Sequence, residues 1–239
     1  MKKLMTILIA SFAMLITSSV SAEDSPHEFS ANVALTTNYM YRGITQTSSQ
    51  PAIQGGFDYG HSTGFYAGVW ASSLEFGAGD DDTTIEIDYY GGIAGELSNG
   101  ISWDLGGLYY QYPGTEADAA GDFDFFEVYG SLGYTFSGVP LEPSIGTFLA
   151  YSPDFFGETG DAFYVTGELG LSLPMGFGLS FLYGNQSIDK GTDYDHIVVG
   201  LNKDLSIFNF DVSYYDGLDD ADCNEELCDA VVFTVSSSF

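Results

Sequence analysis

The sequence has few positive charges. Its 239 residues include five Lys and Arg against 34 Asp and Glu. Nucleic acids are bound through clusters of cations that neutralise phosphates, so this balance excludes nucleic acid as a direct partner. Disordered acidic chains are poor in aromatic residues, whereas this chain has 19 Phe and 17 Tyr. The composition therefore indicates a folded, acidic protein rich in aromatic residues.

Long apolar runs are also absent, since no segment approaches the 18 or more consecutive apolar residues of a spanning helix. The one N-terminal apolar run, residues 4–16, follows Lys2 and Lys3 and precedes small residues that end at Ala22. This order predicts a secretory signal peptide over residues 1–22, cleaved near Ala22. We therefore expect a single mature domain, residues 23–239.

Cysteine occurs twice, as Cys223 and Cys228 within one predicted loop. A secreted chain meets an oxidising environment, so a local Cys223–Cys228 disulfide is predicted. Metal binding by the two thiols alone is disfavoured, and we expect no metal site and no cofactor. The acidic runs at residues 80–82 and 219–226 lack the spacing of a calcium loop and are interpreted as solvated loops.

What the sequence does have is a repeated alternation of apolar and polar residues with period two. Such alternation predicts half-buried β-strands, because successive side chains of a strand point to opposite faces. The predicted strands are residues 29–42, 51–60, 65–76, 83–97, 101–112, 123–136, 141–152, 162–173, 178–187, 194–204, 208–216 and 230–239.

The connections between these strands alternate between short turns and longer polar loops. Outer-membrane barrels have this arrangement, with short periplasmic turns and longer external loops. The sequence therefore predicts an all-β fold, a transmembrane antiparallel up-and-down β-barrel of about 12 strands in the outer membrane of a Gram-negative cell. An even number of strands places both termini on the periplasmic side.

The apolar face carries aromatic residues near the predicted strand ends. Aromatic girdles of this kind flank the apolar band of outer-membrane barrels. The girdle residues expected here are Tyr39, Tyr41, Tyr109, Phe136 and Tyr214.

The last predicted strand alternates up to a terminal Phe239, with no polar tail after it. This ending resembles the terminal signature that the outer-membrane barrel assembly machinery reads. We therefore expect Phe239 to direct membrane insertion, with outer-membrane lipid and lipopolysaccharide as surroundings. The alternative interpretation is an edge strand that simply ends in Phe.

The motif Asn38-Tyr39-x-Tyr41-Arg42-Gly43-x-Thr45-Gln46-Thr47, with the segments 51–59 and 64–70 after it, resembles a known family. It is similar to the TorF family of proposed porins, also called the Gcw_chp family of proteobacterial proteins. The resemblance is densest over residues 38–113. It implies an outer-membrane barrel with a pore, and it implies neither catalytic residues nor a named substrate.

The polar face of the strands carries carboxylates and a single cation. Carboxylates that face a narrow lumen attract cations and repel anions. The candidate pore-lining residues are Arg42, Asp58, Glu86, Asp88, Glu96, Asp104, Glu127, Glu168 and Asp211, with Arg42 as an ion-paired constriction element near the outer mouth.

Two functions remain open at this point. The first is a porin-like channel for small solutes or ions that prefers cations. The second is a non-conducting barrel whose external loops bind a surface ligand or partner, because bulky inward residues would plug a barrel of this size. The bulky inward residues are Tyr66, Trp70, Tyr90, Tyr110 and Tyr129. An enzyme is not expected, because His61 and His196 are predicted at opposite ends of the barrel.

Overall fold

The computed structural model describes residues 25–76, 83–115, 122–218 and 229–239. The predicted signal peptide, the pair Cys223 and Cys228, and the acidic runs 80–82 and 219–226 lie outside these ranges. Within them, no helix is long and apolar enough to cross a membrane.

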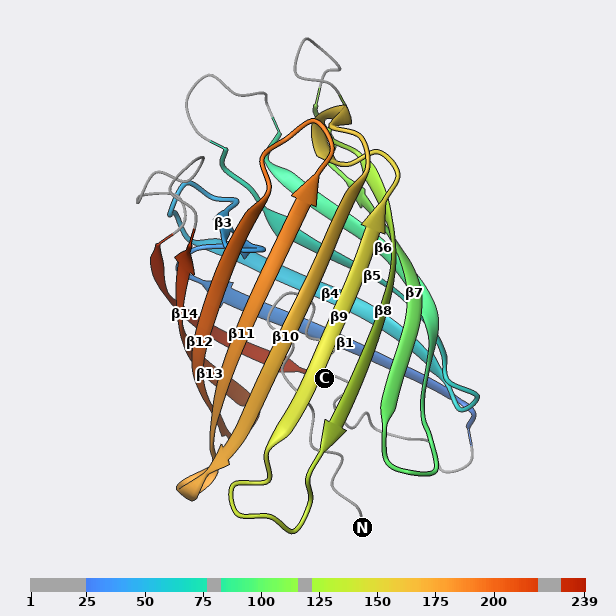
Figure 1. Ribbon diagram of the computed structural model, residues 1–239, viewed down its shortest axis with the longest axis vertical. Coiled ribbons are helices and arrows are strands. Elements are labelled where there is room, and N and C mark those ends of the chain that lie inside the picture. Colours follow the sequence, from blue (N-terminus) through green and yellow to red (C-terminus); the bar gives the residue numbers. More distant parts are fainter. Residues whose placement is uncertain (1–24, 77–82, 116–121, 219–228) are drawn as a thin grey trace.

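Twelve antiparallel strands form a closed barrel, which confirms the predicted fold class (Figure 1). Each strand pairs with its neighbour in sequence, and β1 pairs with β14 to close the barrel. The strands are β1 (His27–Thr36), β4 (Ala52–His61), β5 (Phe65–Ser73), β6 (Ile85–Glu96), β7 (Ser102–Gln111), β8 (Phe125–Thr135), β9 (Ser144–Ser152), β10 (Ala162–Leu173), β11 (Phe177–Ile188), β12 (Tyr194–Leu205), β13 (Phe208–Gly217) and β14 (Ala230–Ser238).

The remaining elements are short. Two-residue strands β2 (Met40–Tyr41) and β3 (Ile44–Thr45) pair only with each other. The 3₁₀ turns η1 (Phe156–Glu158) and η2 (Pro174–Gly176) lie between barrel strands. Most connections at one end of the barrel, such as 62–64 and 206–207, are shorter than most of those at the other, such as 112–124. We call these ends the short-turn end and the long-loop end.

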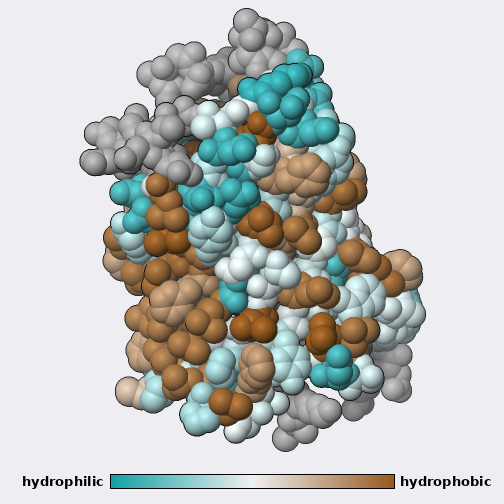
Figure 2. Space-filling model, viewed as in Figure 1, coloured by the Kyte–Doolittle hydropathy of each residue, from teal (hydrophilic) through white to brown (hydrophobic). Residues whose placement is uncertain are grey.

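The outward face of the wall is apolar, as Figure 2 shows by the brown residues along the barrel and the teal residues near the long-loop end. Side chains such as Leu35, Phe57, Leu105, Phe163 and Phe233 are more than half exposed. So large an exposed apolar surface is unfavourable in water, and transmembrane barrels carry an outward apolar band of this kind.

The first strand is shorter than predicted. The period-two pattern predicted one strand over residues 29–42, but β1 ends at Thr36 and the chain then leaves the wall. Residues 38–47 form a small hairpin inside the barrel, which we call the inner hairpin (Figure 1). Tyr39 and Tyr41 therefore pack in the interior and are not girdle residues, whereas Tyr109, Phe136 and Tyr214 are outward and about 40% exposed.

Candidate functional site

The inner hairpin turns at Arg42 and Gly43. Both have positive φ, 48° and 86°, as the two-residue turns of tight hairpins require. Gly43 tolerates this conformation, whereas Arg42 is a non-glycine residue held in a sparsely populated region. A Cβ on Gly43 would lie 2.8 Å from Cβ of His196, so the tip also needs glycine to approach β12.

The side chain of Asn38 holds the base of the hairpin together. Its Oδ1 accepts hydrogen bonds from Oγ1 of Thr45 at 2.6 Å and Oγ1 of Thr47 at 3.0 Å. The backbone N–H of Tyr39 donates to Oγ1 of Thr47, and that of Gln46 donates to the carbonyl oxygen of Tyr39. The residues that carried the family resemblance thus build one compact element inside the barrel.

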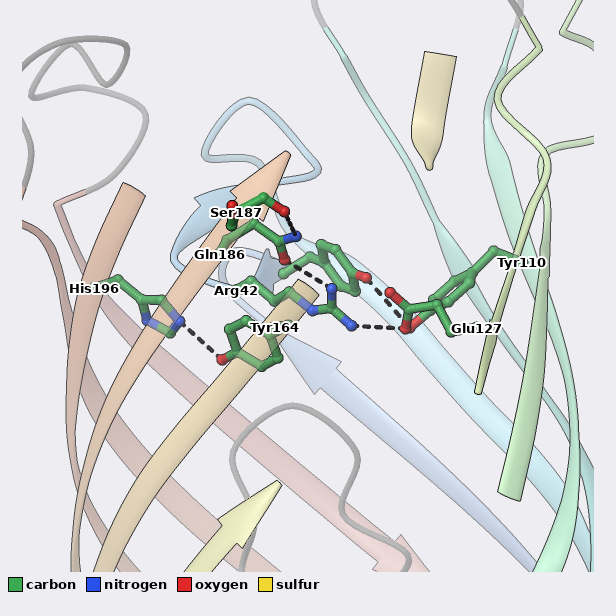
Figure 3. A network of polar contacts seen from close by, with 8 residues as sticks. Arg42, Tyr110, Glu127, Tyr164, Gln186, Ser187 and His196 are labelled. Carbon is green, nitrogen blue, oxygen red and sulfur yellow. Dashed lines mark hydrogen bonds and ion pairs between the residues drawn. The ribbon is translucent and has the colours of Figure 1, made fainter. Parts of the chain in front are cut away.

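Arg42 connects the hairpin tip to the opposite wall (Figure 3). Its Nη2 lies 2.7 Å from Oε2 of Glu127 on β8, and its Nη1 donates to Oε1 of Gln186 on β11 at 2.8 Å. Tyr110 also donates to Oε2 of Glu127, at 3.2 Å. The Arg42 and Glu127 side chains are 3% and 2% exposed, so the ion pair is buried across the lumen.

Aromatic rings enclose the guanidinium of Arg42. Its Cζ lies 4.2 Å from the ring centre of Tyr164 and 4.8 Å from that of Tyr41. Tyr164 is itself held by a 2.9 Å hydrogen bond between its hydroxyl and Nε2 of His196. A desolvated cation gains from such faces, so these rings fix the tip in addition to the ion pair.

The other side of the hairpin is held by Tyr39. Its hydroxyl donates to Oε1 of Glu86 at 2.8 Å, and its ring meets that of Trp70 edge-on at 5.5 Å. Burial raises the pKa of the Tyr39 hydroxyl, and the charge of Glu86 raises it further. Tyr39 therefore stays protonated and donates this hydrogen bond at all physiological pH values.

Three of the predicted carboxylates surround the hairpin in the long-loop half of the interior. Glu86 and Asp88 on β6 and Glu127 on β8 are all fully buried. Glu86 and Glu127 have the partners just described, whereas neither carboxylate oxygen of Asp88 has a hydrogen-bond partner. Among the described residues, no group of three or more His, Cys, Asp or Glu is arranged to hold a metal ion.

Four other predicted carboxylates lie in the interior toward the short-turn half and are only partly buried. They are Asp58, Asp104, Glu168 and Asp211. Each accepts a hydrogen bond from a neighbouring side chain, from Tyr90, Tyr66, Thr166 and Ser213 respectively. Glu96, the remaining candidate carboxylate, lies exposed at the end of β6 and belongs to neither group.

Bulky tyrosines of this half lie along the wall, on glycines of adjacent strands. The ring of Tyr90 covers Gly68, and the hydroxyls of Tyr66 and Tyr129 lie over Gly92 and Gly106. A strand glycine permits this close approach because it has no side chain. The hydroxyls of Tyr66 and Tyr129 are 2.5 Å apart, so the rings stay against the wall and do not project across the lumen.

Tyr164, Gln186 and His196 are also parts of the site, although the sequence did not predict them. All three fall on inward positions of β10, β11 and β12, where alternation alone could have placed them. Nothing in the sequence indicated that they meet Arg42, because that contact depends on the hairpin crossing the lumen.

A family model described as "Bacterial protein of unknown function (Gcw_chp)" matches residues 21–239. No curated protein matches the chain.

Solved structures with a similar fold are outer-membrane barrels of low sequence identity. "KdgM porin in complex with disordered oligogalacturonate" has a TM-score of 0.55 at 8% identity and covers 88% of this chain and 98% of its own. "NanC porin structure in rhombohedral crystal form" has a TM-score of 0.55 at 10% identity and covers 87% of this chain and 98% of its own. The COG4313 outer membrane channel from Pseudomonas putida F1 has a TM-score of 0.51 at 11% identity and covers 92% of this chain and 100% of its own.

Proposed function

The chain belongs to the Gcw_chp family of bacterial proteins of unknown function, and we propose that it is an outer-membrane, porin-like channel for small solutes that prefers cations. The observation that carries this proposal is the closed barrel with an apolar outside and partly exposed carboxylates inside. An apolar wall suits the bilayer, and a polar interior suits a solute path. The fold shared with porins supports the same function.

The sign of the interior charge supports cations as the preferred solutes. Among the residues that the structure describes, Arg42 is the only Lys or Arg in the interior, and Glu127 already pairs with it. Asp58, Asp104, Glu168 and Asp211 face the interior with no ion pair among the described residues. KdgM was solved with oligogalacturonate, an acidic polymer. The carboxylates of this chain would repel such a polymer and would concentrate cations.

The inner hairpin sets the narrowest part of the proposed path. It crosses the long-loop half of the lumen and is fixed to β6, β8 and β11 by Tyr39 and Arg42. This observation also favours a second candidate, a non-conducting barrel whose loops bind a ligand. In a conducting channel the hairpin narrows the lumen, whereas in a non-conducting barrel the hairpin closes the lumen.

We also propose that the chain belongs with the TorF porins of proteobacteria. Residues 1–22 are then a signal peptide that is removed near Ala22. The barrel assembly machinery inserts the remaining domain, residues 23–239, into the outer membrane beside lipopolysaccharide. A Cys223–Cys228 disulfide is part of the same proposal. If the disulfide forms, a thiol-reactive label should not modify Cys223 or Cys228 in the denatured, unreduced protein. The proposed activity is transport and includes no catalytic step.

Conductance of the purified barrel in planar bilayers tests the function. We expect discrete current steps in potassium chloride and a reversal potential in a salt gradient that reports cation preference. Anion selectivity would overturn the assignment of interior charge. Complete lack of current from folded protein, identified by its heat-modifiable migration on gels, would favour the non-conducting barrel.

A further inference from the structure

Asp88 is a buried carboxyl group with no hydrogen-bond or ion-pair partner among the described residues. Its side chain is 0% exposed, it points inward from β6, and both of its oxygens lack a hydrogen-bond partner. Buried charges are costly unless they are paired or hydrogen-bonded. The ionised form of Asp88 therefore needs a partner that the described residues do not supply.

The charges around Asp88 show which kind of group is missing. Glu86 and Glu127 lie close enough to act on Asp88 electrostatically, so three carboxylates share this region. Arg42 is the only interior Lys or Arg in the described ranges, and its ion pair is with Glu127. A positively charged occupant would restore the balance.

The neighbours of Asp88 are aromatic. In the sheet register it lies between Trp70 of β5 and Tyr110 of β7, and adjacent positions on one face of a sheet are in contact distance. Tyr39 of the inner hairpin meets Trp70 edge-on, and Tyr41 meets Tyr110 edge-on at 5.8 Å. Two aromatic residues thus flank the carboxylate in the sheet, and a tyrosine of the inner hairpin packs against each of them.

An aromatic setting with one free carboxylate suits an organic cation better than a metal ion. Alkylammonium groups bind against aromatic faces and pair with a carboxylate. Calcium and magnesium need several oxygen ligands, and no such group exists among the described residues. From this geometry we infer that Asp88, with Trp70, Tyr110 and the hairpin tyrosines Tyr39 and Tyr41, forms a binding site for the ammonium group of a small organic cation.

This inference deepens the proposed function and rests on it, since the cation reaches Asp88 through the lumen. Asp88 is the next inward position on β6 after Glu86, the hydrogen-bond partner of Tyr39, so the site adjoins the inner hairpin. The hairpin tyrosines shift when the cation enters, because Asp88 is closed off in this structure.

Tryptophan fluorescence can report binding directly, because the chain has two Trp residues and one is at the site. In a Trp103→Phe protein, Trp70 is the remaining fluorophore. We expect choline to change its emission in a saturable way at constant ionic strength. Potassium chloride should not change the emission of Trp70, and neither should 3,3-dimethylbutan-1-ol, the uncharged analogue of choline. Equal responses to choline and to the uncharged analogue would overturn the inference.

Asp88→Asn, made in the same background, should weaken choline binding by at least about thirtyfold, the effect of removing one partner of a desolvated charge pair. Glu96→Gln is the control, because Glu96 lies exposed at the far end of the same strand, β6, and joins neither group of interior carboxylates, so it should leave binding unchanged. Unchanged binding in folded Asp88→Asn protein would overturn the inference. If Asp88→Asn does not fold, the comparison of choline with its uncharged analogue on the parent protein still decides.

The two proposals can fail separately. A protein that conducts cations but shows no saturable choline response keeps the proposed function and loses this site. A protein that binds choline through Asp88 but carries no current keeps the site and loses the channel.

Discussion

Glycine and tyrosine form a repeated unit on the inner wall, in which a ring from one strand covers a glycine of the next. Gly68 beneath Tyr90 shows the requirement clearly, since a Cβ on Gly68 would overlap the ring. The ring cannot swing away freely, because the Tyr90 hydroxyl donates to Asp58.

Gly68→Ala should therefore destabilise the barrel by about 1–3 kcal/mol, the usual cost of overpacking, and lower the conductance by moving Tyr90 inward. Unfolding in urea and single-channel recording would measure the two effects. Gly167→Ala on β10 is the control, because nothing lies within 4 Å of the added Cβ. Equal stability of the two variants would contradict the explanation.

Arg42 and Glu127 lock the tip of the inner hairpin, and removing one partner leaves a buried charge. We expect Glu127→Gln to weaken the closed position of the hairpin by about 3–5 kcal/mol. Arg42 is the sole arginine of the chain, so its reaction with phenylglyoxal, followed by mass spectrometry, reports its exposure. Labelling should be slow in the parent protein and faster in Glu127→Gln.

Glu168→Gln serves as the control for that experiment, since Glu168 interacts with Thr166 and does not touch Arg42. It should label as slowly as the parent protein. Fast labelling of the parent itself would show that the ion pair does not hold the tip in place.

The inner hairpin is an element added to a barrel that closes without it. All twelve wall strands pair with one another, and β2 and β3 pair with none of them. Replacing residues 38–47 by a short Gly-Ser linker should therefore leave a folded barrel and raise its conductance severalfold. Gel mobility of unheated samples checks folding, and bilayer recordings check conductance. A conductance equal to that of the parent would show that the hairpin is not the constriction.

The last strand closes the barrel on β1 over few residues. Register pairs join residues 234–238 to residues 32–36, and two backbone hydrogen bonds of 2.9 and 3.1 Å join Phe239 to Ala31. Deleting Phe239 removes this final pairing along with the predicted insertion signature. We expect much less folded protein in membranes, measured as the heat-modifiable band. Normal amounts would contradict a role for Phe239 in assembly.

At the scale of the whole molecule, the interior carboxylates act as one field that salt can screen. The Debye length falls from about 30 Å at 0.01 M to about 3 Å at 1 M salt. Cation preference should therefore be strong in dilute salt and weak in concentrated salt. Neutralising Asp58, Asp104, Glu168 and Asp211 together should largely abolish it in dilute salt. Reversal potentials measure both effects, and an unchanged preference in the fourfold variant would contradict them.

The sequence alone determined the barrel, because period-two alternation and the spacing of turns are local properties that survive in any fold. Ile85, Ile87 and Tyr89 alternate with Glu86 and Asp88, and the structure has the same strand with the same two faces. Strand number and order followed from the same signals, since each strand pairs with its neighbour along the chain.

Only the tertiary structure decided what fills the barrel. Residues 37–42 continue the alternation of β1, so the pattern could not show that the chain turns inward after Thr36. The cause is long-range. Arg42 pairs with Glu127, and Tyr39 donates a hydrogen bond to Glu86. Gly43 packs closely against His196, so all three contacts are with distant strands. Contacts across a lumen join residues far apart in sequence, and no local pattern encodes them.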